Sequence, residues 1–152
     1  MKRVSLWMIG IGLCITVGLL TVQHGYAEEK EHEPTCTLKT LKGRYLFALQ
    51  GWRLPPAVTE LTPSNAAGFH IFNGDGTGTD IVTFRRNGVT LLENFVTPTS
   101  YTVDADCTGS ITVTDGPTFD IFIAPNGESF AEIVTVPLVQ GGADIARRVS
   151  RK

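Results

Sequence analysis

Cysteine and histidine are scarce in this sequence, and their scarcity excludes most kinds of metal site. The 152-residue chain has three cysteines and three histidines, with no CxxC or HxxxH pair among them. Structural zinc sites need four ligands of these types. A GxSxG motif, which carries the nucleophile of many hydrolases, is also absent. The sequence therefore predicts no metal, no cofactor and no recognisable catalytic nucleophile.

Positive charge is also in short supply. Residues 28–152 contain 11 Lys and Arg against 15 Asp and Glu, a net charge of −4. Nucleic acids and anionic membrane surfaces attract clustered positive charge, so we expect neither as a partner. One basic run, RRVSRK at 147–152, is explained most simply by alternation along a terminal strand.

The N-terminus has the pattern of a secretory signal peptide. Lys2 and Arg3 precede an almost wholly apolar segment over residues 4–22, and Gly25 and Ala27 supply the small residues of a cleavage site. We expect cleavage after Ala27 and export to the periplasm or the extracellular space. The alternative is an uncleaved membrane anchor, because about 18 apolar residues can span a bilayer.

The remaining chain is expected to form one domain. Residues 28–35, EEKEHEPT, are charged and end near a proline, which indicates a short flexible lead-in. Residues 36–152 are enough for a single hydrophobic core.

Cys36 and Cys107 are the two cysteines that would remain after processing. An even count in an oxidising compartment indicates a disulfide. A catalytic cysteine would need a basic partner that lowers the pKa of its thiol, whereas Asp104 and Asp106 flank Cys107. We therefore expect a disulfide between Cys36 and Cys107.

Helical periodicity is missing, and a period of two residues takes its place. Apolar residues alternate with polar ones between turn signals such as NGDGT and three NG or DGP turns. Nine segments are expected to be extended and to make up about eight strands: 43–50, 66–73, 78–86, 89–96, 101–105, 109–114, 118–124, 128–136 and 143–150. The segment TPTS at 97–100 is expected to break the chain between two of them.

Short connections between successive strands predict antiparallel neighbours. The predicted fold is therefore all-β, a single antiparallel up-and-down barrel, because closure removes exposed strand edges. A β-sandwich is the alternative, although only residues 51–65 are long enough for a crossover. This segment contains Trp52, which could plug one end of a barrel or contact a ligand.

The glycine-rich segment NGDGTGTD at 73–80 invites comparison with a calcium-binding loop. In the register of an EF-hand loop that begins at Asn73, Phe84 stands where a bidentate glutamate should be. We interpret the segment as a β-turn in which glycines provide backbone freedom.

Four segments resemble a set of small exported bacterial proteins. They are CTLKTLKGRYLFALQG, FHIFNGDGTG, YTVDADCTGSITV and FDIFIAPNGE, which begin at residues 36, 69, 101 and 119. This set is similar to allene oxide cyclase-like or lipocalin-like barrels. The resemblance covers about residues 36–150 and implies a barrel and a cysteine pair, without implying a reaction.

Alternation predicts which side chains point into the barrel. The expected inner set, with Trp52 at one end, forms the candidate ligand site: Tyr45, Phe47, Trp52, His70, Phe72, Tyr101 and Glu132. Phe130 and Arg147 are further inner candidates. Aromatic side chains with a few polar groups are typical of a small-molecule pocket, although the same residues could fill a solid core.

The leading hypothesis is a non-catalytic binder of a small apolar or amphipathic ligand. One alternative is a cyclase- or isomerase-type barrel enzyme, which requires Glu132 to lie inside. Another is a structural or inhibitory envelope protein that acts through residues 51–65.

Overall fold

The computed structural model describes residues 35–53, 60–136 and 140–151. The predicted signal peptide and nearly all of the predicted lead-in fall outside these residues. A short 3-10 helix, η1 (Leu38–Leu41), precedes eight strands. The strands are β1 (Gly43–Arg53), β2 (Thr62–Phe72), β3 (Thr77–Arg86), β4 (Val89–Val103), β5 (Thr108–Val113), β6 (Thr118–Ile123), β7 (Ser129–Val136) and β8 (Gln140–Ser150).

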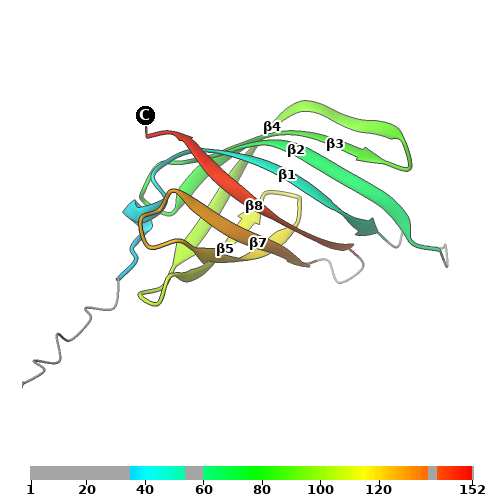
Figure 1. The fold of residues 1–152 in the computed structure, drawn as a ribbon. Coiled ribbons are helices and arrows are strands. Elements are labelled where there is room, and N and C mark those ends of the chain that lie inside the picture. The colour runs from blue at the N-terminus through cyan, green and yellow to red at the C-terminus, as the bar shows by residue number, and fades with distance from the viewer. Residues whose placement is uncertain (1–34, 54–59, 137–139, 152) are drawn as a thin grey trace, which may run out of the picture. The chain divides into compact units, whose positions relative to one another are not determined.

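The eight strands form one closed antiparallel barrel (Figure 1). Each strand pairs with the next in the sequence, and β1 pairs with β8 to close the sheet. This confirms the predicted up-and-down barrel and excludes the sandwich. Among the described residues, no helix is long and apolar enough to cross a membrane.

The predicted break at residues 97–100 was wrong, because β4 runs through them without interruption. Pro98 pairs with Thr79 of β3, and its carbonyl accepts a hydrogen bond from the Thr114 N–H. In an antiparallel strand the N–H and the carbonyl of a residue point toward the same neighbouring strand, so the N–H that Pro98 lacks would also face that neighbour. Here that neighbour is β5, which ends at Val113, so the proline interrupts no ladder.

The connection predicted at residues 51–65 is shorter in the structure, because both of its ends belong to strands. β1 continues to Arg53 and β2 begins at Thr62, while residues 54–59 lie outside the described part. Trp52 lies an even number of residues from Leu46 on β1, so both side chains point to the outer face of the barrel, and Trp52 is 56% exposed. It is therefore not a buried plug of the barrel.

The two ends of the barrel differ. One end, which we call the η1 end, carries η1 together with the β2–β3, β4–β5 and β6–β7 connections. Leu41 is fully buried there, and Cys36 forms the predicted disulfide with Cys107. The other end carries the β3–β4 hairpin and is called the hairpin end. β2, β3 and β4 extend past β5 and β7 there (Figure 1).

Candidate functional site

A cluster of charged side chains lies in the barrel interior. His70 and Glu132 are each 1% exposed, and Asp80 is also buried. The Nδ1 atom of His70 lies 2.9 Å from Asp80 Oδ1, and its Nε2 atom lies 3.3 Å from Glu132 Oε2. One imidazole therefore bridges two carboxylates.

Strand geometry explains how these three residues meet. His70 on β2 is directly opposite Asp80 on β3, so their side chains share the inner face. Glu132 lies on β7 between the buried Phe130 and Val134. Because inner residues of a small closed barrel face one another, Glu132 meets His70 across the interior.

Aromatic rings enclose the imidazole. Its ring stacks on Phe47 with centroids 4.3 Å apart and lies parallel to Phe72 at 5.8 Å. Phe119 and Phe130 approach it at 6.4 and 5.9 Å. This part of the interior is filled by side chains, as expected for a barrel of this size.

The carboxylates keep the imidazole charged in spite of its burial. Burial alone would lower the pKa of His70, but attraction to Glu132 and hydrogen bonds to Asp80 and Glu132 raise it to about 10. His70 is therefore an imidazolium at neutral pH, with one carboxylate on each side.

Asp144 extends the cluster to the barrel wall. It lies on β8 directly opposite Glu132, and its Oδ2 accepts a 2.7 Å hydrogen bond from the Ala48 N–H of β1. The β1–β8 pairs on either side are Leu46 with Arg147 and Gln50 with Ala143. The Asp144 carboxylate thus takes the place of a backbone acceptor between these two strands.

Glu132 and Asp144 form a carboxyl pair. Burial, repulsion from Glu132 and a hydrogen bond with Glu132 raise the pKa of Asp144 to about 7. The hydrogen bond of His70 Nε2 goes to Glu132 Oε1 at 3.4 Å. Glu132 Oε2 and Asp144 Oδ1 are buried, and neither accepts a hydrogen bond from the described residues. A proton between the two carboxyl groups would satisfy both. The described residues contain no group of acidic, histidine or cysteine side chains suited to a metal ion.

A second inner surface lies at the hairpin end. Here the inward-facing residues of β1 to β4 form two rows of cross-strand neighbours. The rows are Phe47, Gly68, Val82 and Phe95, and Leu49, Ala66, Phe84 and Leu92. Phe47 and Leu49 are buried, whereas Phe95 is 47% and Leu92 38% exposed. The inner face is therefore apolar and becomes accessible toward the hairpin.

Arg86 provides charge at the edge of this surface. It is directly opposite Ser64 of β2, which is buried, and its guanidinium lies 5.9 Å from the centre of the Phe84 ring. The Nε atom of Arg86 is buried and has no acceptor among the described residues. An uncompensated buried donor is costly, so an external acceptor here would be favourable.

The structure divides six of the seven predicted ligand residues into two groups, and the exposed Trp52 belongs to neither. Phe47, His70, Phe72 and Glu132 surround the charged cluster. Tyr45 and Tyr101 are buried nearer the η1 end, where the Tyr45 hydroxyl donates to Gly127 O and the Tyr101 hydroxyl to Leu38 O.

Arg147 was wrongly expected to point inward. It is exposed, whereas its neighbour Arg148 is partly buried. Two further residues, Asp144 of the charged cluster and Arg86 of the hairpin end, were missed. The residue types were visible in the sequence, but the strand register that places them was not.

Comparisons with protein-family models, curated proteins and solved structures found no match. The similarity to allene oxide cyclase-like or lipocalin-like barrels stays a prediction.

Proposed function

We propose that this protein is an exported barrel that binds a small amphipathic molecule at the hairpin end. The apolar body of the ligand would lie on Phe84, Leu92 and Phe95, and an anionic head group would contact Arg86. The observation that carries the proposal is the exposure of Phe95 and Leu92 on the inner face of the barrel. The Cys36–Cys107 disulfide supports export, since such bonds persist in oxidising compartments.

The mouth of a β-barrel is a common place for ligands because it offers a concave apolar wall. Burying Phe95 and Leu92 against a ligand would remove apolar surface from water. The deeper interior is a weaker candidate, since rings fill the space around His70.

The charge at the site favours a carboxylate or a similar anion. Arg86 holds a donor without an acceptor, and guanidinium groups bind carboxylates in a planar geometry. The ligand class is therefore a molecule with an apolar chain or ring system and one acidic group.

Binding can be tested with a fluorescent fatty acid and its matched fatty alcohol. We expect saturable binding of the acid at micromolar concentration. Phe95→Ser should weaken binding at least fivefold. The control Phe122→Ser removes a phenylalanine of similar exposure from β6 and should leave binding unchanged. Arg86→Gln should weaken binding of the fatty acid and leave binding of the fatty alcohol unchanged. Equal effects of the two serine variants would contradict the proposed site.

A cyclase- or isomerase-type enzyme is the second candidate. Its support is the pairing of the buried Glu132 with the partly buried Asp144, whose raised pKa would place one proton between the two carboxyl groups near neutral pH. Such a pair can donate and accept protons near neutral pH. The test is turnover of a bound unsaturated fatty acid or epoxide: loss of turnover in Asp144→Asn with binding retained would support catalysis. Binding without turnover in the unmodified protein would contradict it.

A further inference from the structure

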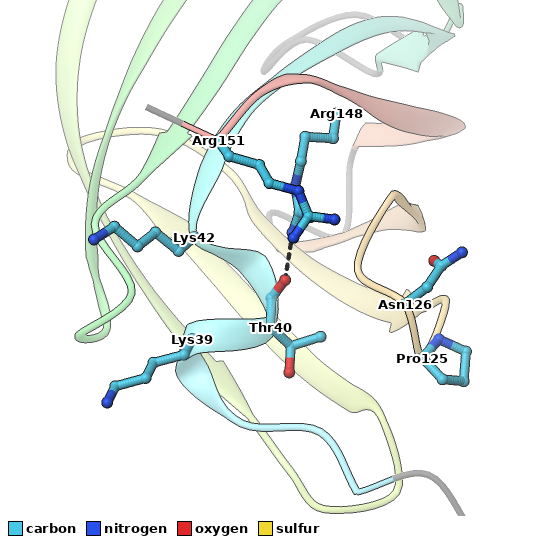
Figure 2. Close-up of a pocket in the computed structure, with 7 residues that line it drawn as sticks. All are labelled: Lys39, Thr40, Lys42, Pro125, Asn126, Arg148 and Arg151. Carbon is cyan, nitrogen blue, oxygen red and sulfur yellow. Dashed lines mark hydrogen bonds between the residues drawn. The ribbon is translucent and has the colours of Figure 1, made fainter.

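We propose that the η1 end carries a second binding site, for an anion with two or more phosphate groups. The site is a surface depression of about 290 Å³. Its lining residues are Lys39, Thr40, Lys42, Pro125, Asn126, Arg148 and Arg151 (Figure 2). It lies at the opposite end of the barrel from the ligand site proposed at the hairpin end, so the two proposals are independent.

The depression has a strong excess of positive charge. Four of its seven lining residues are cationic and none is acidic. Beside it lies Glu128, whose Oε1 accepts hydrogen bonds from both Arg148 and Arg151. One carboxylate therefore neutralises only one of two guanidinium groups.

Arg148 is held in place at the base of the depression. Its side chain is 4% exposed. Nε donates to the Tyr45 hydroxyl at 3.0 Å, and Nη2 donates to the Thr40 carbonyl, the bond drawn in Figure 2. A buried and fully oriented guanidinium provides a fixed positive centre, and an anion that uses it need not order that side chain.

Lys39 and Lys42 are exposed and form no ion pair within the described residues. In Figure 2 the two guanidinium groups lie together near Thr40, while both ammonium groups extend in another direction. The cations thus form two groups, and an anion with several phosphates could contact both.

The charge of the surrounding chain supports this assignment. Neither 35–53 nor 145–151 contains an acidic residue, although the chain as a whole carries a net charge of −2. Four like charges around one depression repel one another, and a bound polyanion relieves that repulsion. The basic run near the C-terminus therefore contributes to a binding site in addition to a strand.

The probe is inorganic tripolyphosphate, titrated by calorimetry at physiological ionic strength beside monophosphate at the same ionic strength. We expect saturable binding of tripolyphosphate, at least tenfold tighter than that of monophosphate. The variant Lys42→Gln/Arg151→Gln should weaken the binding of tripolyphosphate at least tenfold. The control Arg85→Gln/Arg147→Gln also removes two exposed cations and should change the affinity for tripolyphosphate less than twofold. Arg148 is left intact because it supports the fold.

A second arm distinguishes a soluble ligand from a lipid head group. It uses neutral vesicles with and without a lipid that carries two phosphates. Binding in either arm that Lys42→Gln/Arg151→Gln abolishes supports the site and identifies the source of the phosphates. Absence of saturable binding in both arms, or equal weakening by the two double variants, overturns the proposal. Unchanged circular dichroism melting of the variants ensures that a loss of binding is not a loss of fold.

Discussion

The imidazole of His70 and the carboxylate of Glu132 are in contact across the barrel, although 62 residues separate them in the sequence. Both side chains are almost completely removed from solvent. Buried charges are tolerated only when they are paired and hydrogen-bonded. The stability of the barrel is therefore expected to depend on this pair.

Replacement of Glu132 by glutamine should destabilise the protein strongly. The change leaves the His70 imidazolium with one carboxylate, and breaking a buried ion pair costs about 3 kcal/mol or more. Urea unfolding at pH 7 measures the loss. The control is Asp120→Asn, an exposed carboxylate on the neighbouring strand β6, which should change stability by less than about 0.5 kcal/mol. Equal effects of the two variants would contradict the role of the pair.

His70 should make the protein less stable in alkaline solution. The folded pKa of about 10 lies above the ordinary value of 6.5, so the folded protein holds a proton that the unfolded chain releases. The stabilisation is complete below pH 6.5 and is lost as the pH rises toward 10. Urea unfolding at pH 6, 7.5 and 9 should show decreasing stability. An imidazole that titrates near pH 6.5 in NMR spectra of the folded protein would contradict this assignment.

Asp144 should give a pH dependence in a lower range. Its folded pKa of about 7 lies above the ordinary 3.8, so the folded protein retains a proton that the unfolded chain loses between pH 4 and 7. Asp144 therefore lowers stability as the pH rises through this window. Asp144→Asn keeps an acceptor for the Ala48 N–H and removes the ionisation. Its stability relative to the unmodified protein should rise from pH 4 to 7, and a constant difference would contradict the raised pKa.

Removal of the disulfide should destabilise the η1 end. Cys36 and Cys107 are 71 residues apart, and closing a loop of this length restricts the unfolded chain by about 4 kcal/mol in the chain-entropy model. The variant Cys36→Ser/Cys107→Ser should unfold at clearly lower denaturant concentration, with a similar dependence on denaturant. Reduction of the unmodified protein with dithiothreitol should give the same shift. Unchanged stability in both experiments would show that the bond contributes little.

Much of the barrel could be predicted from local patterns. The alternation in residues 43–50 placed Tyr45 and Phe47 inside, and that in 128–136 placed Glu132 beside Phe130, because side chains of a strand alternate between two faces. The break predicted around Pro98 was wrong because the sequence does not show where the neighbouring strand ends.

The pattern of β8 pointed to the wrong face. Ile145, Arg147 and Val149 form the more apolar set, yet Ile145 and Val149 are exposed. Asp144, Ala146 and Arg148 have the opposite parity; Ala146 is fully buried, and Asp144 and Arg148 are partly buried. Hydrophobicity alone could not identify the inner face because partners on β1, β7 and η1 satisfy the charges of this set.

The sequence by itself determined most of the strands and turns, the antiparallel order and the cysteine pair, because each depends on neighbouring residues or on a simple count. Only the tertiary structure decided which charged groups meet. Closure of the barrel brings Glu132 to His70 and Arg148 beside Tyr45 and Thr40, and the register of β7 with β8 sets Asp144 opposite Glu132. These contacts depend on strand register, and a shift of one residue would turn each side chain to the other face.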